Sequence, residues 1–179
     1  QLGSSFADPL QDLLCAHDEF LYDQLEFRDA LESLAAYYAA LRSTDADKTK
    51  LTQCFTQLVE ANQNQAFALE AKLDVEFHMI IAEAAHNVVL LHTLRSLHAV
   101  LAKSISSNLK NLFEKKAARQ RVMEQHTHLY QAIMEGKAEE ARAGAHTHLV
   151  FVEDNLLKMR QEETRIQRSL RRNEHQNPR

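Results

Sequence analysis

Ten of the 179 residues are histidines, and several of them stand at spacings that suit a metal site. Asp74 and His78 are four residues apart, so both side chains lie on one face if the segment is helical. A carboxylate and an imidazole at this spacing can bind one cation together. The same spacing is common by chance, so the pair alone does not identify a site.

His126 and His148 lie on either side of Gly136, ten residues before it and twelve after it. Gly136 is typical of a helix C-terminus with a tight turn, so the flanking segments are expected to form an antiparallel hairpin. At a rise of about 1.5 Å per residue, both histidines lie about 15–18 Å from the turn and nearly level. The helical periodicity directs both inward and directs His128 and His146 outward.

The two pairs together offer one carboxylate and three imidazoles: Asp74, His78, His126 and His148. These oxygen and nitrogen donors suit a divalent metal, zinc first and nickel, manganese or iron(II) as further choices. The alternative is that each inward histidine is a hydrogen-bonded core residue, which is common for a single buried histidine. The level pair across the hairpin leaves both interpretations open.

Arg28 borders the apolar stripe of the segment 21–41. An arginine there is most often a surface residue that forms an ion pair. Less often it binds a carboxylate through its planar guanidinium, so Arg28 is a candidate for effector binding. Glu83-x-x-His86 fits half of a di-iron motif, but the second copy that such a bundle needs is absent. The sequence contains no GxSxG, P-loop or HExxH motif.

Helices must position these residues, because the sequence has very few turn-forming residues. Pro9 and Pro178 are the only prolines, and residues 10–177 contain just two glycines, Gly136 and Gly144. A sheet protein needs many more. We therefore predict an all-α fold, an antiparallel bundle of six or seven helices, in which the fourth is apolar almost all round and hence central. The expected helices span about residues 8–15, 21–41, 45–61, 66–85, 86–113, 116–135 and 137–168 or beyond.

The composition, 45% hydrophobic and 26% charged, is that of a globular protein. No apolar stretch is long enough to span a membrane, and two cysteines without a CxxC motif indicate a reducing, cytoplasmic location. Residues 158–179 carry a net charge of +4 and the remainder −8, so the body lacks a basic surface for nucleic acid. We expect residues 1–7 to be a linker remnant, 8–160 the domain, and 161–179 a basic helical or disordered tail.

Several motifs, in this order and at these spacings, are similar to those of one family. They are Leu25-Glu26-Phe27-Arg28-Asp29-Ala30-Leu31-Glu32, Asp74-x-x-x-His78 followed by Ala82-Glu83-Ala84-Ala85-His86-Asn87, Glu124-Gln125-His126, and Ala145-His146-Thr147-His148-Leu149. Over about residues 8–172 the chain resembles the C-terminal effector-binding and dimerisation domain of FadR-type regulators in the GntR superfamily. It looks closest to the branch of the pyruvate dehydrogenase complex repressor, and lactate- and glycolate-responsive regulators are similar too.

This resemblance implies a small carboxylate effector, a homodimer, and a winged helix-turn-helix domain that precedes the present one. The chain would then contact DNA only through that missing N-terminal domain, and it would not contact a membrane. In metal-binding members of the family, one aspartate and three histidines hold a divalent metal. The matching residues here are Asp74, His78, His126 and His148.

We therefore predict a sensor domain and not an enzyme. A carboxylate such as pyruvate or lactate would bind at open positions of the metal, with Arg28 as a clamp, and would shift the dimer between two arrangements. The alternative is a metal-dependent enzyme that acts on a small carboxylate, with Glu76 or Glu83 as its general base. A third hypothesis is a purely structural dimerisation bundle.

Overall fold

The computed structural model describes the backbone of residues 20–176 and, with gaps at 100–108, 160 and 163, the side chains of residues 23–168. This part of the chain contains six helices and no strand, so the predicted all-α class is confirmed. The helix expected at residues 8–15 lies outside the described residues. The helices are α2 (Phe20–Arg42), α3 (Asp45–Gln63), α4 (Phe67–Ala84), α5 (Val88–Phe113), α6 (Lys116–Met134) and α7 (Ala138–Gln176).

Local signals account for several of the helix ends. Thr44 and Asp47 form the capping box that starts α3, and the Asn87 side chain caps α5. Gly136 has φ +73°, a left-handed conformation that glycine adopts without a steric penalty, and it turns the chain from α6 into α7 as predicted. The expected end of α3 at Ala61 is wrong by two residues, because helical hydrogen bonding continues to Gln63.

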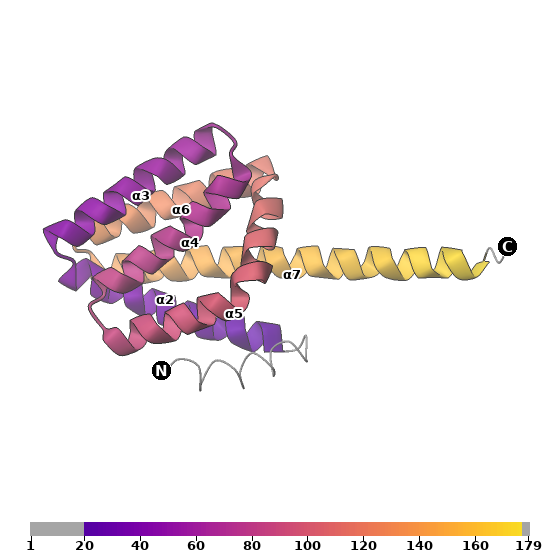
Figure 1. The fold of residues 1–179 in the computed structure, drawn as a ribbon, viewed down its shortest axis with the longest axis horizontal. Coiled ribbons are helices and arrows are strands. Elements are labelled where there is room, and N and C mark those ends of the chain that lie inside the picture. The colour runs from indigo at the N-terminus through magenta and orange to yellow at the C-terminus, as the bar shows by residue number, and fades with distance from the viewer. Residues whose placement is uncertain (1–19, 177–179) are drawn as a thin grey trace.

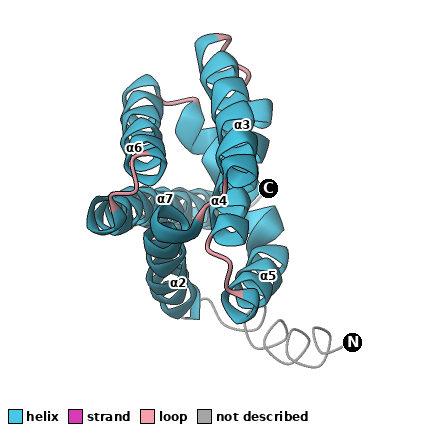
Figure 2. Ribbon diagram, turned by 90° about the vertical axis from the view of Figure 1, so that its left-hand side faces the viewer, coloured by secondary structure: helices cyan, strands magenta, loops and turns pink. Residues whose placement is uncertain are grey.

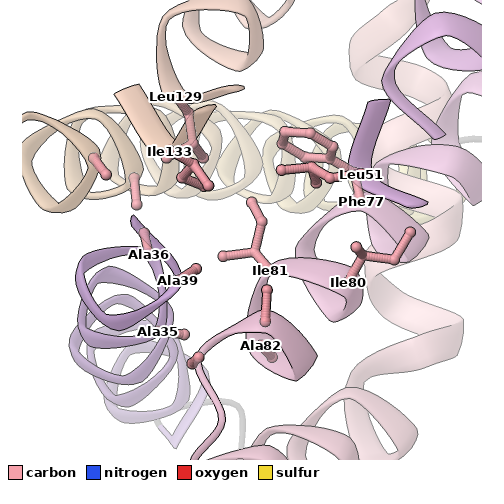
Figure 3. Close-up of a cluster of buried hydrophobic side chains, with 14 of the residues drawn as sticks. Ala35, Ala36, Ala39, Leu51, Phe77, Ile80, Ile81, Ala82, Leu129 and Ile133 are labelled. Atoms are coloured by element: carbon pink, nitrogen blue, oxygen red, sulfur yellow. The ribbon is translucent and has the colours of Figure 1, made fainter. Parts of the chain in front are cut away.

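Helix α4 lies at the centre of the bundle, as its apolar sequence predicts, and packs against α2, α3 and α5 (Figures 1 and 2). Figure 3 shows α2 facing α4 and α6 through small side chains, so that Ala36 and Ala39 lie opposite Ile81 and Ile133. Alanines allow two helix backbones to approach closely. This close approach also brings the turns of α2 that precede Ala36 against α4.

Two hydrophobic clusters fill the bundle, one at each end of the helices that carry the predicted ligands. The first contains Ile81, Leu129 and Ala145, and the second contains Ala71, Val122 and Val152. Along α4, α6 and α7 the aspartate and the three inward histidines lie between these two sets of residues. The polar cluster is therefore enclosed by apolar packing on both sides along the helices.

Helix α7 has 39 residues and extends well beyond the bundle (Figure 1). The domain boundary expected after residue 160 falls inside this helix, which is continuous to Gln176. The expected basic tail is therefore helical as far as Gln176, while the division into domain and tail remains a prediction. Among the described residues, no helix is both long and apolar enough to cross a membrane.

Candidate metal centre

Three helices bring the four predicted ligands together. Asp74 and His78 are one turn apart on α4, His126 comes from the middle of α6, and His148 comes from α7. Each has at most 4% of its surface exposed, and one donor atom from each lies within 4.8 Å of the others. The hairpin at Gly136 does set the two distant histidines level, with ring centroids 4.4 Å apart.

The polar contacts of His78 and His148 direct both Nε2 atoms toward the cluster. The two Nε2 atoms are 3.1 Å apart. The Nδ1 atom of His78 lies 2.8 Å from Glu32 Oε2, and the Nδ1 atom of His148 lies 3.4 Å from Gln125 Oε1. These acceptor oxygens favour a proton on each Nδ1, which leaves a lone pair on each Nε2. Two facing lone pairs repel each other unless a proton or a cation lies between them.

Asp74 and His126 leave buried polar atoms without hydrogen bonds. Asp74 Oδ1 and His126 Nε2 are 3.1 Å apart, but the N–H direction does not align with this contact. Neither carboxylate oxygen of Asp74 has any other hydrogen-bond partner, and neither has His126 Nε2. Buried unpaired polar atoms are costly and rare, so their convergence on one point fits a ligand set for a cation.

The electrostatics favour the protonation states that metal ligands need. Burial alone would raise the pKa of Asp74, but contact with His126 and the charges that the three imidazoles can carry hold that pKa well below its usual range. Burial lowers the pKa of His126. Burial and then repulsion from His126 and His78 hold the pKa of His148 well below its usual value. At neutral pH Asp74 is ionised and both His126 and His148 are neutral, which suits metal binding.

Arg28 is not the surface residue that its sequence position favoured. Its side chain is 1% exposed, and its Nε donates a 2.6 Å hydrogen bond to Glu32 Oε1. Burial alone would lower the pKa of Arg28, but the negative charge of Glu32 outweighs it and the pKa is raised. The Nη1 atom of Arg28 has no hydrogen-bond partner. The guanidinium is thus fixed by one edge and retains an unused donor.

Sequence reasoning missed three residues that support the site: Glu32, His98 and Gln125. All three are buried and contact either a predicted ligand or each other. Some signals were present, since Glu32 follows Arg28 by four residues and His98 follows Leu94 by four on an apolar stripe. These spacings place side chains on a face, but they do not show which helix that face meets.

The donor set of three nitrogens and one oxygen is that of a zinc, nickel, manganese or iron site. Its partners for Nδ1, a carboxylate and an amide, are of the kind that orient metal-bound histidines. The ring of Phe77, which is fully buried, packs edge-on against His78 and His126 and shields them from water.

Comparisons with known proteins agree with this arrangement. Residues 23–151 match the FCD domain. The chain belongs to this family. It is 33% identical over 167 residues to the putative L-lactate dehydrogenase operon regulatory protein of Escherichia coli, covering 93% of the chain and 63% of that protein. It is 32% identical over 151 residues to the E. coli Glc operon transcriptional activator, covering 83% of the chain and 59% of that protein.

A third relative is the HTH-type transcriptional regulator LutR of Bacillus subtilis, 31% identical over 156 residues, which cover 86% of the chain and 69% of LutR. The chain thus spans about three fifths of the length of the two E. coli relatives. The resemblance to effector domains of GntR/FadR-type regulators is confirmed, and the lactate-related regulators fit it. The proposed closeness to the pyruvate branch remains a prediction.

All three relatives are named as regulators of transcription or of an operon, and none of them as an enzyme. The two candidates for a general base in the alternative hypothesis lie at or near the surface. Glu83 forms surface ion pairs with Lys50 and Arg95, and Glu76 is exposed.

Proposed function

We propose that this chain is the effector-binding and dimerisation domain of a GntR/FadR-type transcriptional regulator that senses a small carboxylate at a buried metal. The observation that carries the proposal is the convergence of four buried donor atoms within 4.8 Å, from residues far apart in sequence. The relatives named for lactate dehydrogenase and Glc operons support an effector such as lactate, glycolate or pyruvate.

The metal would be held by Asp74, His78, His126 and His148, with zinc as the first choice and nickel, manganese or iron as alternatives. A bound divalent ion supplies a Lewis-acid site for a carboxylate oxygen. The protein's own residues supply the rest: three imidazoles, one carboxylate, and a surrounding apolar shell that excludes water.

Arg28 is the proposed clamp for the effector carboxylate. Its unused Nη1 donor is buried, and Asp74 is among the charges that raise its pKa, so the guanidinium lies in the electrostatic range of the ligand set. A planar guanidinium binds carboxylates more strongly than a neutral donor does. A carboxylate that accepts from Nη1 would satisfy this atom without displacing Glu32 from Nε.

In the longer protein we place this domain in a cytoplasmic homodimer that contacts DNA through an N-terminal winged helix-turn-helix domain. Effector binding would favour one of two arrangements of α4, α6 and α7 and so alter the spacing of the two DNA-binding domains.

Isothermal titration calorimetry with L-lactate, glycolate and pyruvate tests the proposal, on the zinc-loaded chain and on the chelator-treated chain. We expect at least one of these acids to bind the zinc-loaded chain and to bind far more weakly without the metal. The variant Arg28→Lys should weaken binding, because an ammonium group lacks the planar fork that lets Nε bond Glu32 while Nη1 is presented to the effector. Equal affinity with and without metal would contradict sensing at the metal. No binding of any of the three acids would contradict carboxylate sensing itself.

A further inference from the structure

Glu32 is a buried carboxylate on which three helices converge. Its Oε1 accepts hydrogen bonds from Arg28 Nε on α2, at 2.6 Å, and from His98 Nε2 on α5, at 2.9 Å. Its Oε2 lies 2.8 Å from His78 Nδ1 on α4 and makes no hydrogen bond to any other group. One oxygen is therefore fully engaged in holding α2 to α5, and the other faces a predicted metal ligand.

The contact with Oε2 determines which nitrogen of His78 carries the proton. A carboxylate oxygen at 2.8 Å from a bare ring nitrogen would place two lone pairs against each other, so the proton belongs on Nδ1. The N–H of His78 is off the line to Oε2, so a small rotation of the ring is needed to align it. The lone pair then remains on Nε2, the atom that faces His148.

We propose that Glu32 is a positioning residue of the metal centre: it fixes His78 as an Nε2 ligand and ties that ligand to Arg28 and to His98. This inference rests on the proposed function, because it assigns a role around the proposed metal. Glu32 does not touch the metal. It acts through His78, by holding the ring in one tautomer and one orientation.

The charge of Glu32 suits this role. Its Oε1 accepts from the guanidinium of Arg28, which stays charged in proteins, at 2.6 Å, and this contact favours an ionised carboxylate. An ionised partner on Nδ1 makes Nε2 a stronger donor to a metal. The same carboxylate keeps Arg28 fixed by its Nε edge, so the ligand and the proposed effector clamp share one anchor.

The variant Glu32→Gln tests the proposal, with Glu70→Gln as its matched control. Glu70 is also a buried carboxylate, it lies on α4 one turn before Asp74, and it accepts a hydrogen bond from Asn62 on α3 and not from a predicted ligand. We expect Glu32→Gln to lower zinc affinity by about 10- to 100-fold, as the loss of a histidine's carboxylate partner does elsewhere. Glu70→Gln should stay within about twofold of wild type.

Two further measurements keep the test valid if Glu32→Gln fails to fold. The double variant Arg28→Met/Glu32→Gln removes both buried charges and is compared with Arg28→Met alone, and the zinc affinity should again fall by about 10- to 100-fold. Long-range ¹H–¹⁵N spectra of the zinc-loaded wild-type chain should show His78 protonated at Nδ1 and bound through Nε2, a signature that a merely structural carboxylate would not produce.

The outcomes separate the inference from the function on which it rests. Wild-type zinc affinity in the Glu32 variants, or His78 bound through Nδ1, overturns the role of Glu32 and leaves the metal centre intact. A wild-type chain that binds no divalent metal overturns both.

Discussion

Removing and restoring zinc should change the stability of this chain by an amount that depends on all four ligands. If free zinc is present at about 100 times its dissociation constant, binding contributes about 2.7 kcal/mol to the free energy of unfolding. For a domain of this size, about 1 kcal/mol shifts Tm by roughly 2–4 °C, so the expected rise in Tm is about 5–11 °C. Differential scanning fluorimetry of the chelator-treated chain, with and without added zinc, measures this shift.

The structure supplies matched controls for the ligand variants. His126→Ala and His148→Ala remove buried ligands, whereas His128→Ala and His146→Ala remove exposed histidines two residues away on the same helices. A ligand variant that binds zinc about 100-fold more weakly keeps only about 0.4 kcal/mol of the zinc effect, which is a Tm shift of at most about 2 °C. The two exposed-site variants should keep the full shift.

The zinc-dependent difference within each variant is the relevant quantity, because an alanine in place of a buried imidazole also leaves a cavity that lowers Tm without zinc. Asp74→Asn and His78→Ala extend the series to α4. A full zinc shift in all four ligand variants would refute the assignment of the site. Loss of the shift in His128→Ala or His146→Ala would instead show that zinc acts at the surface.

Three other predictions concern stability without metal. The pKa values of His126 and His148 are lowered in the folded chain, so the contribution of these imidazoles to the free energy of unfolding is present above the unfolded-state pKa of about 6.5 and is lost as pH falls. Urea melts of the metal-free chain should therefore show a lower midpoint in acid below that pH. An unchanged midpoint would contradict this. Burial and nearby carboxylates raise the pKa of Glu153 to about 7, so the contribution of this side chain to the free energy of unfolding is lost as pH rises through 7. In the same assay, Glu153→Gln should stabilise the chain by about 1 kcal/mol at pH 8 and by less at pH 5. Gly136→Ala should destabilise the chain by about 1 kcal/mol because φ is +73°. Gly144→Ala should stabilise it by about 0.5 kcal/mol, since the added Cβ lies 3.1 Å from the exposed, rotatable imidazole of His128 and in ordinary contact, 3.8 Å, with Leu129 Cα. Thermal melts in which both variants shift the same way would contradict this.

The two pairs of candidate ligands could be predicted from sequence, because each pair lies on one helix or across one turn. The spacing of Asp74 and His78 fixes a shared face, and Gly136 fixes the height of His126 against His148. These relations survive any reasonable packing of the hairpin. Several helix boundaries followed from caps and from Gly136, with errors of two residues at the end of α3 and at the start of α5.

The second layer around the ligands could not be predicted in the same way. Arg28 lies at the border of an apolar stripe, and whether such a residue is buried depends on how closely the next helix approaches. Here the alanines of α2, such as Ala36 and Ala39, allow α2 to pack tightly on α4, and Arg28 is enclosed together with Glu32. Which helix meets which face is a tertiary property that spacing does not contain.

The position of the cluster explains how a small chemical event there can affect the whole domain. Asp74 and His78 lie on α4, His126 on α6 and His148 on α7, while Glu32 and His98 add α2 and α5 through contacts of 2.8 Å and 2.9 Å. Of the six described helices, only α3 supplies no residue to this network. A charge change at the cluster therefore acts on five helices at once, because buried ionic contacts cannot be weakened singly without leaving an unpaired charge. Helix α3 is linked to the cluster through its packing on α4 and α6.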